Sequence, residues 1–516
     1  MKIPAINIDL QTLPAPVPIA RARVTAQEWL AAAGAVRDAG GRLLALWGGS
    51  QTEGKTVCVA YVVADGLAWL ELPLPGEQTG YPDLVPIFPC AARMQRAAAD
   101  LSGLRAQGSQ DQRPWLNHGA WPSDHFPLRP SAEAAPSFAD SALIDYPFVR
   151  VEGDGVHEIA VGPVHAGVIE PGHFRFSVVG EKVLRLEQRL GYTHKGIEQR
   201  MTLMPPLQAQ RLAGRVSGDS TVAYAWAYCM ALESAAGCAI TPRAASLRAL
   251  LLERERVANH LGDLGALGND AAFAFGLAQF SRLREDWLRL SKQAFGHRLM
   301  MDCTVPGGVA CDLDQALIDR LRGQCDVIEP EVRNLRAVYE EHAGLQDRFM
   351  TTGRVAPALA AQLGLTGLAG RASGQAWDLR CDHPWAPYEQ LQVRMATQRN
   401  GDVAARVLVR FDEIFESLRL IRAILADLPA GPLHSQVDLP AQASGGAGWV
   451  EGWRGEILVA LELDSAANQH RILRCHCHDP SWQNWPVLEH AVIGNIVPDF
   501  PLINKSFNLS YSGQDL

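Results

Sequence analysis

The hydrophobic pattern changes character along the chain. The runs Leu43–Trp47 and Thr56–Val63 are short and apolar, as in buried strands, and Ala-rich segments of helical character surround them. A strand-like stretch at about 148–190 comes before a long, mainly helical part that extends to about residue 428. A further β segment, Trp449 to Cys477, follows. The pattern predicts an α+β fold with small sheets near both ends of a helical body.

Two stretches have the composition of connecting segments. Residues 107 to about 137 are rich in Pro, Ser, Gln and Asp, and residues 430–448 are rich in Pro, Gly, Ser and Ala. We therefore expect a small α/β domain at 1–110, a linker at 111–143 and a large, mainly helical domain at 144–516.

The clearest helix begins at Thr241 and Pro242, an N-cap residue followed by Pro at the first helical position. It is predicted to extend to about Gly268. A polar stripe lies beside its apolar face at helical spacing, and it consists of Glu253, Arg256, His260 and Asp263. Two interpretations are open: a solvated face, or a half-buried ionic network against another helix or a partner subunit.

The ten cysteines are scattered and none forms a C-x-x-C pair, so the sequence shows no iron–sulfur or zinc framework. In a cytosolic protein we expect reduced, mostly buried thiols. The tightest group is Cys475-His476-Cys477-His478, whose alternation predicts a strand with thiols on one face and imidazoles on the other. A metal site at this group is the less favoured alternative.

Composition argues against two classes of protein. The net charge of −9 comes without an evident basic stripe, so we expect no nucleic-acid binding. No apolar run reaches the roughly 18 to 20 residues that span a bilayer, and the N-terminus lacks the apolar core of a signal peptide. We expect a cytoplasmic chain without a transmembrane segment, which a partner would have to anchor if it works at a membrane.

Two segments of the chain resemble cysteine-containing motifs of a known family but have small residues at the cysteine positions. Residues 215–220 resemble the Arg-x-Cys-Gly-x-Cys motif of nickel–iron hydrogenase large subunits, and residues 506–513 resemble their Ser-Leu-Asp-Pro-Cys-x-x-Cys motif. The four Cys positions are occupied by Ser217, Ser220, Ser510 and Gly513. A nickel–iron centre requires soft thiolate ligands, for which neutral hydroxyls are poor substitutes. The resemblance therefore implies a hydrogenase-like body without the hydrogenase metals.

Further motifs follow the order of the superfamily that hydrogenase large subunits share with the 49-kDa-type subunit of respiratory complex I. The main ones are Gly191–Glu198, Glu253–His260 and Glu451–Glu456. Near the N-terminus, residues 81–84 and 96–103 resemble the 30-kDa-type subunit of complex I. The two modules fused in this order resemble the large subunit of formate-hydrogenlyase-type, group 4 hydrogenases.

The resemblance assigns catalytic or proton-transfer roles to Glu170, His173, Asp219 and Arg454. Glu170 matches a proton-gate carboxylate, expected in an apolar cavity with a raised pKa. His173 matches the His that binds the quinone head group in complex I, while the assisting Tyr is replaced by Gly218. We expect Arg454, the cation above the metal in hydrogenases, to pair with Asp219. The degenerate metal or quinone pocket would be lined by Ser217, Gly218, Ser220, Ser510 and Gly513.

The resemblance also implies partners and cofactors. The partners are an iron–sulfur small subunit, a ferredoxin-like subunit and membrane-embedded antiporter-like subunits, which would place the chain on the inner face of the cytoplasmic membrane. His165 and His194 would lie near the interface with the small subunit, and the alternative is that they are hydrogen-bonded core residues. The chain itself would bind no metal and no cofactor except a possible quinone. An iron–sulfur cluster is expected in the small subunit, and NAD binding is associated with complexes of this type.

Two functions follow from the resemblance. In the first, the chain is the large subunit of a complex I-like, energy-converting hydrogenase-related membrane complex. It takes part in electron transfer of the NADH– or ferredoxin–quinone oxidoreductase type, coupled to ion translocation, and is not a hydrogenase on its own. In the second, it is a non-catalytic structural or coupling scaffold. The first predicts a solvent-shielded pocket around Ser217, Asp219 and Ser510, and the second predicts that side chains fill this volume.

Overall fold

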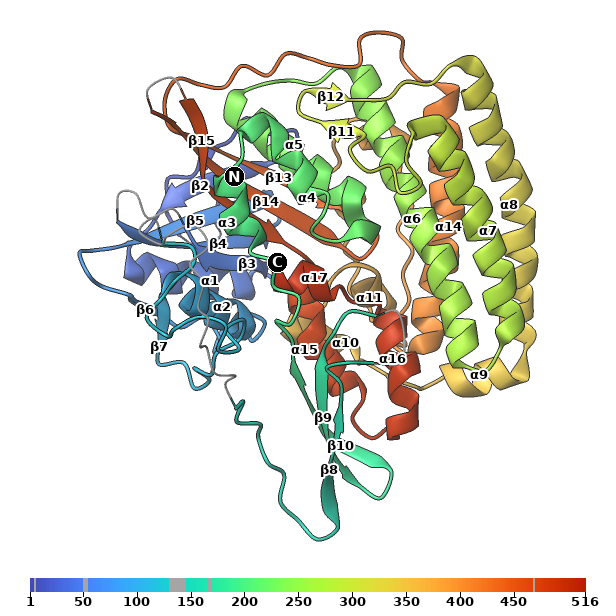
Figure 1. Ribbon diagram of the computed structural model, residues 1–516, viewed down its shortest axis with the longest axis horizontal. Coiled ribbons are helices and arrows are strands. Elements are labelled where there is room, and N and C mark those ends of the chain that lie inside the picture. Colours follow the sequence, from blue (N-terminus) through green and yellow to red (C-terminus); the bar gives the residue numbers. More distant parts are fainter. Residues whose placement is uncertain (4–5, 50–53, 130–144, 166–168, 467–468) are drawn as a thin grey trace.

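The computed structural model describes residues 1–516 except 4–5, 50–53, 130–144, 166–168 and 467–468 (Figure 1). Its N-terminal part is a five-stranded sheet in the order β1-β2-β5-β4-β3. The strands are β1 (Gln11–Thr12), β2 (Ile19–Arg23), β3 (Arg42–Gly48), β4 (Lys55–Val63) and β5 (Gly66–Leu74). Only the β2–β5 pair of this sheet is parallel. The two apolar runs expected to be strands are β3 and β4.

Helices α1 (Ala26–Asp38) and α2 (Ala91–Ser102) accompany this sheet, with α2 in contact with β3. A short parallel pair, β6 (Gly80–Pro82) and β7 (Arg105–Gln107), lies beside them. A second, antiparallel sheet projects from the body at the bottom of Figure 1. Its strands are β8 (Val156–Val161), β9 (His173–Val179) and β10 (Lys182–Arg189).

Long helices form a layer on the right of Figure 1. They are α6 (Pro242–Asp270), α7 (Ala274–Phe295), α8 (Gln315–Glu341) and α14 (Val403–Ala426). A third antiparallel sheet lies between this layer and the N-terminal sheet, with strands β13 (Ser444–Glu451), β14 (Glu456–Ala466) and β15 (Gln469–His478). The chain then forms α15 (Ser481–Ala491), α16 (Phe500–Phe507) and α17 (Tyr511–Asp515). The predicted α+β fold is confirmed.

Short elements connect these layers. The helices are α3 (Ile197–Thr202), α4 (Gln210–Ala213), α9 (Ala343–Phe349), α10 (Pro357–Leu363), α11 (Gly367–Ala372), α12 (Leu379–Asp382) and α13 (Tyr388–Leu391). The 3-10 turns are η1 (Pro206–Gln208), η2 (Gly218–Ser220) and η3 (Val497–Asp499), and a small hairpin is formed by β11 (Thr304–Val305) and β12 (Gly308–Val309). In the described part of the chain, no helix is both long and apolar enough to cross a membrane.

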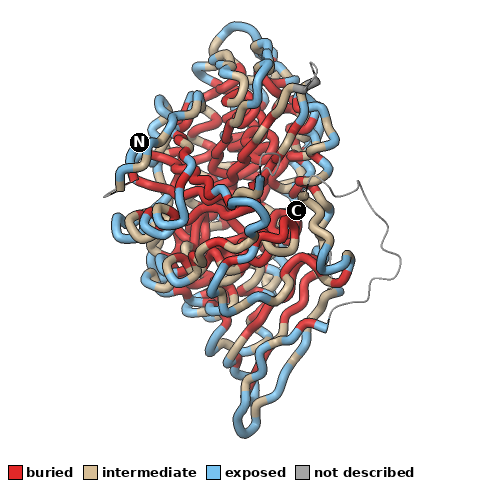
Figure 2. The backbone as a smooth tube through the Cα atoms, turned by 90° about the vertical axis from the view of Figure 1, so that its left-hand side faces the viewer, coloured by how far each residue is buried: buried red, intermediate tan, exposed pale blue. Residues whose placement is uncertain are grey.

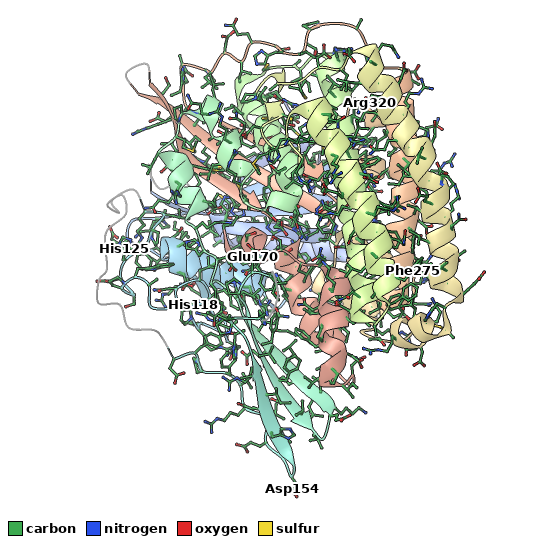
Figure 3. The ribbon with its side chains drawn as sticks, turned by 45° about the vertical axis from the view of Figure 1, so that its right-hand side comes forward. His118, His125, Asp154, Glu170, Phe275 and Arg320 are labelled. Atoms are coloured by element: carbon green, nitrogen blue, oxygen red, sulfur yellow. The ribbon has the colours of Figure 1, made fainter. Side chains whose placement is uncertain are left out.

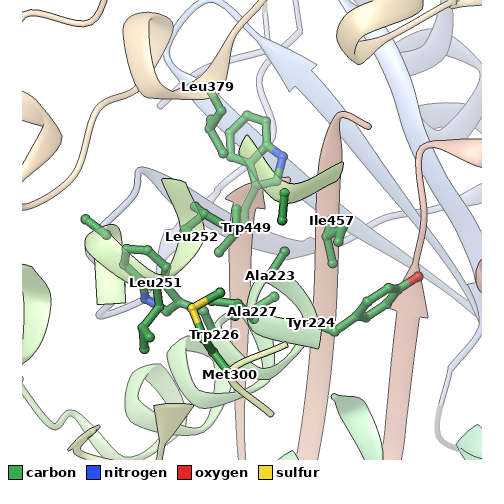
Figure 4. Close-up of a cluster of buried hydrophobic side chains, with 14 of the residues drawn as sticks. Ala223, Tyr224, Trp226, Ala227, Leu251, Leu252, Met300, Leu379, Trp449 and Ile457 are labelled. Carbon is green, nitrogen blue, oxygen red and sulfur yellow. The ribbon is translucent and has the colours of Figure 1, made fainter. Parts of the chain in front are cut away.

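Helix α5 (Thr221–Ala236) lies unusually close to strand β13 because of two glycines. A Cβ atom at Gly446 would lie 2.1 Å from the Ala231 carbonyl oxygen, and one at Gly448 would lie 1.9 Å from that of Ala227. Only Gly permits this approach of two backbones. Figure 4 shows α5 side chains meeting those of the sheet, including Trp449 and Ile457. The packing fixes the start of α5, where the first motif loop ends.

The hydrophobic core joins both ends of the chain. One buried cluster combines the helical layer with β13–β15 and one face of the N-terminal sheet. A second combines the other face of that sheet with β9, β10 and the C-terminal helices. Figure 2 shows buried residues running through the centre of the molecule without interruption. In the first part of the segment expected as a linker, Trp115 is buried within the second cluster, and residues 130–143 lie outside the described residues.

The polar stripe on α6 is buried rather than solvated. Glu253, Arg256 and His260 are 0% exposed and Asp263 is 3% exposed. The solvated-face interpretation is therefore wrong, and the ionic network is more deeply buried than expected because α14 and the segment around α11 and α12 cover it. The helix begins as predicted: Thr241 caps it by accepting from the Ala244 N–H, and Pro242 is its first residue.

The alternating Cys–His group lies on strand β15 as predicted. Cys475 and Cys477 are 0% exposed and belong to the first core cluster. On the other face, His476 stacks on Trp47 with 4.6 Å between ring centroids and bonds to Glu198 at 2.7 Å. The strand therefore contributes its thiols to the core, while its imidazoles bond to polar side chains of α3 and α15 and one of them, His476, stacks on Trp47 of the N-terminal sheet.

The buried network on α6 predicts a large cost for removing one carboxylate. Glu413 accepts from Arg371 at 2.8 Å and faces His260 at 2.7 Å, so Glu413→Gln removes the anion that pairs most closely with this buried guanidinium and leaves it one carboxylate bond, to Glu451. We expect a loss of about 3–5 kcal/mol of unfolding free energy, measured by denaturant titration at neutral pH. The control is Glu340→Gln on α8, whose pair with Arg336 lies at the surface. Equal denaturation midpoints for the two variants would contradict the argument.

Candidate functional site

The two motif loops meet, although they are far apart in the sequence. The hydroxyl oxygens of Ser217 and Ser510 lie 3.0 Å apart across a separation of 293 residues. Ser217 also donates to the Asp219 carboxylate at 2.6 Å, and Ser220 lies 3.4 Å from the same oxygen. Three of the four positions that would carry thiolates in a hydrogenase therefore form one hydrogen-bonded group.

Helix α6 anchors the first loop. Glu255 accepts from the backbone N–H groups of Val222 at 2.7 Å and Ala223 at 3.2 Å, which belong to the first turn of α5. Burial and the charge of Asp219 raise the pKa of Glu255 to about 8, in spite of these two hydrogen bonds. One turn further along α6, Asn259 donates to the Asp219 carbonyl at 2.7 Å. The motif residues of α6 thus position the loop rather than line an open cavity.

The second loop is fixed by its own cap. The Ser510 hydroxyl accepts from the Gly513 N–H at 2.8 Å and so begins helix α17. The Ser510 N–H donates to the hydroxyl of Ser481, at the start of α15, at 2.9 Å. The serine at a former thiolate position is therefore an N-cap residue, a role that hydroxyls perform well.

An ion pair joins the loops at the centre of the site. Arg454, in the turn between β13 and β14, donates through Nη1 to Asp219 at 2.9 Å and through Nη2 to its other oxygen. The same guanidinium donates to the Asn508 carbonyl and lies 4.0 Å from the centre of the Trp453 ring. The Arg454 side chain is 6% exposed, and that of Asp219 is 34% exposed. Burial opposes ionisation of Asp219, but Arg454 outweighs it and lowers the pKa of Asp219 to about 2.

A second carboxylate lies behind this pair. Asp263 on α6 accepts from Arg410 Nε at 3.0 Å and from the Asn508 side chain at 2.7 Å, and it lies 3.3 Å from the Lys505 ammonium. Asn508 therefore touches both ionic groups, with its carbonyl on Arg454 and its amide on Asp263. The centre of the site is held by charge-assisted hydrogen bonds, which are stronger than neutral ones.

Asp479 takes the space beside the fourth former thiolate position. A Cβ atom at Gly513 would lie 2.4 Å from an Asp479 carboxylate oxygen. That carboxylate accepts from the Tyr224 hydroxyl at 2.8 Å and from the Ser481 N–H at 2.8 Å, so it is fixed on two sides. Asp479 is 1% exposed. No feature of the sequence pointed to this residue.

Glu170 and His173 lie at the rim and not among the central residues. Glu170 is exposed, in contrast to the apolar cavity that the sequence suggested, and among the described residues its carboxylate accepts from the Ser512 N–H at 3.1 Å (Figure 3). Nδ1 of His173 lies 3.1 Å from the Gly162 carbonyl oxygen. Its Nε2 is buried and has no hydrogen-bond partner among the described residues. Burial lowers the pKa of His173, which keeps the ring neutral.

Other expected residues have separate positions. Gly218 is exposed, and a Cβ atom placed on it would meet nothing within 4 Å. His165 bonds to the Gly172 carbonyl at 2.9 Å, and His194 bonds to the Asp515 carbonyl at 2.8 Å. Both histidines therefore bond to backbone carbonyls beside the C-terminal loop.

The residues that could hold a metal lie elsewhere. In the described part of the chain, one group of three potential ligands has its ligand atoms within 4.8 Å of one another, and it consists of Cys58, Glu71 and Glu462. Arg21 already donates to Glu71 at 2.7 Å, so a cation would have to displace a guanidinium. Glu71 and Glu462 also line a cavity of about 710 Å³ between the N-terminal sheet and β13–β14, away from both motif loops.

Comparison with known proteins agrees with this architecture. Residues 22–137 match the family described as respiratory-chain NADH dehydrogenase, 30 Kd subunit, and residues 267–444 match its 49 Kd subunit counterpart. Formate hydrogenlyase subunit 5 of Escherichia coli (strain K12) is 31% identical over 440 residues, which cover 84% of this chain and 77% of the relative. A carbon monoxide-induced hydrogenase of Rhodospirillum rubrum is 33% identical over 68% of this chain and 97% of the relative.

A solved structure shows the same fold. It belongs to the membrane-bound sulfane sulfur reductase, an archaeal respiratory membrane complex, and one of its chains matches with a TM-score of 0.65 and 25% identity over 70% of this chain and 99% of that chain. The chain therefore belongs to the superfamily of hydrogenase and complex I large subunits, in the group 4 hydrogenase-like form that fuses a 30-kDa-type module to a 49-kDa-type module. The resemblance on which the sequence analysis relied is confirmed.

The contact between Gly513 and Asp479 generates a prediction. Gly513→Cys restores a thiol at its family position but places Cβ against a fixed carboxylate. We expect a loss of about 1–3 kcal/mol of unfolding free energy from overpacking, seen as a lower melting temperature of the purified chain. Gly218→Ala is the control, since its Cβ meets open space. A Gly513→Cys variant as stable as the control would show that Asp479 does not fill this position.

Proposed function

We propose that the chain is the large subunit of a complex I-like, energy-converting hydrogenase-related membrane complex, and that it works without a nickel–iron centre. The complex would transfer electrons as in NADH– or ferredoxin–quinone oxidoreductases and couple the transfer to ion translocation. Its partners would be an iron–sulfur small subunit, a ferredoxin-like subunit and membrane-embedded antiporter-like subunits, with this chain on the inner face of the membrane. Within the complex, the chain would serve as a structural and coupling subunit.

The contact between Arg454 and Asp219 carries this proposal. The guanidinium and the carboxylate meet between the motif loops, where the family pattern would place thiolates and a metal. The donors available there are hydroxyls that already bond to each other or to Asp219, and a soft metal would gain no thiolate. The residues present therefore do not fit a nickel–iron centre.

His173 supports a second candidate, in which the rim binds a quinone. A carbonyl is only an acceptor, so Nδ1 of the neutral ring must carry the proton that it gives to Gly162. Nε2 then presents a lone pair that is buried and unpartnered among the described residues. This atom is suited to accept a hydrogen bond from a hydroquinone hydroxyl and is not a donor to a quinone carbonyl. This candidate is the electron-transfer function that the resemblance implied first, with the quinone at the rim of the site instead of its centre.

Metal content tests the first proposal. We expect the complex purified with this chain to contain iron in its small subunit but no stoichiometric nickel, measured by plasma mass spectrometry after growth with added nickel. One nickel per copy of the chain would overturn the proposal. The assembled complex is required, because a free subunit could lose a bound metal during purification.

Two rim variants separate coupling from quinone chemistry. In a coupling subunit, Glu170→Gln and His173→Phe in the assembled complex keep wild-type electron transfer to quinone. If His173 binds the reduced head group, His173→Phe lowers turnover by about tenfold or more, as expected for the loss of a group that moves protons. The matched control is His157→Phe on the exposed strand β8. Wild-type turnover in both rim variants would rule out the hypothesis that His173 binds a quinone.

A further inference from the structure

A cluster of buried ionisable side chains lies behind the site, and it contains more carboxylates than arginines. It contains three arginines and four carboxylates, none of them more than 3% exposed: Arg256, Arg371, Arg380, Glu253, Asp378, Glu413 and Glu451. Arg256 and Glu253 belong to α6, Glu413 to α14 and Glu451 to β13. With every group ionised, the cluster would carry one uncompensated negative charge away from water. Such a charge is costly, and a group in this position takes up a proton instead.

Three of the four carboxylates accept several hydrogen bonds each, and Glu253 and Asp378 are the first two. The Glu253 carboxylate accepts hydrogen bonds from Arg380 at 3.0 Å, from the Tyr388 hydroxyl at 2.7 Å and from the Ser417 hydroxyl at 2.6 Å. Asp378 receives Arg380 through Nη2 at 2.6 Å and through Nε at 3.0 Å. These two carboxylates are stabilised in their ionised form.

Glu413 is also fully paired. Arg371 donates to it through Nε at 3.0 Å and through Nη2 at 2.8 Å, and His260 lies 2.7 Å from its second oxygen. Burial lowers the pKa of His260, so this imidazole does not supply the missing positive charge.

Glu451 has the weakest support of the four. It receives one guanidinium bond, from Arg371 at 2.9 Å, and one backbone N–H, from Leu379 at 3.2 Å. Arg256 passes close by but donates to the Glu451 carbonyl and not to its carboxylate. The anion that gains least from its neighbours is the one that a proton neutralises most easily.

The remaining charged neighbours of Glu451 do not change this balance. Glu456, across the turn, is neutralised by Arg42 of the N-terminal sheet at 2.7 Å. Asp378, at the start of α12, adds negative charge, and burial together with this charge outweighs the opposing cations Arg371 and Arg256.

We propose that Glu451 is a proton-binding site, which holds the single proton that makes the buried ion cluster neutral. Burial and the charge of Asp378 raise the pKa of Glu451 to about 7, against the opposing effect of Arg371, so the site exchanges its proton near neutral pH. Glu451 and Arg454 belong to the same short turn between β13 and β14. The proton therefore lies three residues from the cation at the centre of the functional site. The inference rests on the fold and is independent of the proposed function.

The first test is an infrared titration of the purified full-length chain. A protonated carboxylic acid has a carbonyl-stretch band that the carboxylate lacks. We expect the wild-type titration minus that of Glu451→Gln to contain one such band with a midpoint near pH 7, because the carboxyl of Glu255, whose pKa is also raised, contributes to both proteins and cancels. The same subtraction with Glu456→Gln, which changes the other carboxylate of the turn, should leave no band. A difference between wild type and Glu451→Gln without a band that titrates in this range would overturn the proposal.

The second test uses stability. The pKa of Glu451 is raised in the folded state, so its proton stabilises the fold fully below about pH 4.3, the unfolded value, and this effect is lost as the pH rises through about 7. Between about pH 5 and 7, the unfolding constant of the wild type should therefore rise by about tenfold per pH unit relative to that of Glu451→Gln. Glu456→Gln should keep the wild-type slope. Parallel profiles for the wild type and Glu451→Gln would contradict the inference.

Discussion

A guanidinium that is almost fully buried requires an anion at close range, and Arg454 meets this requirement with Asp219. The contact joins segments near residues 219, 454 and 508, which come from three separate parts of the chain. Helix α6 supplies the counterparts on one side, and the C-terminal loop supplies them on the other. The convergence of the motif loops, the capping role of Ser510 and the position of Asp263 are all arranged around this one pair.

The same requirement explains the packing of the helical layer. Helix α6 carries its polar stripe into the interior, where solvation is lost and each charge must be compensated by a protein group. The arginines come from α11, α12 and α14 and, in the case of Arg256, from α6 itself, and the carboxylates come from α6, α14, β13 and the start of α12. The ionic contacts therefore fix the positions of these helices and strands relative to one another, which apolar packing alone specifies less strictly.

Local patterns in the sequence predicted the local structure well. The apolar runs that became β3 and β4, the cap at Thr241 and the alternation on β15 are each decided by neighbours in the sequence. The pair between Arg454 and Asp219 was also expected, because the resemblance placed both residues in one site. Two outcomes depended on distant neighbours: coverage by α14 decides the interpretation of the α6 stripe in favour of the ionic network, and the exposure of Glu170, which was expected in an apolar cavity, depends on the surrounding fold. The sequence did not indicate Asp479, because its role is to occupy the space beside Gly513, and only the fold brings these two residues together.

The turn that carries Glu451 and Arg454 has little freedom of its own. A Cβ atom at Gly367 would lie 1.8 Å from the Arg454 carbonyl oxygen, so the two backbones touch there, and Gly455 has a φ of 146°, which side chains rarely permit. Helix α11 begins at Gly367 and contributes Arg371 to the cluster around Glu451. Any rearrangement that displaced Arg454 would therefore move the turn and α11 together. It would change the Arg454–Asp219 ion pair and the buried carboxylates around Arg371 at the same time.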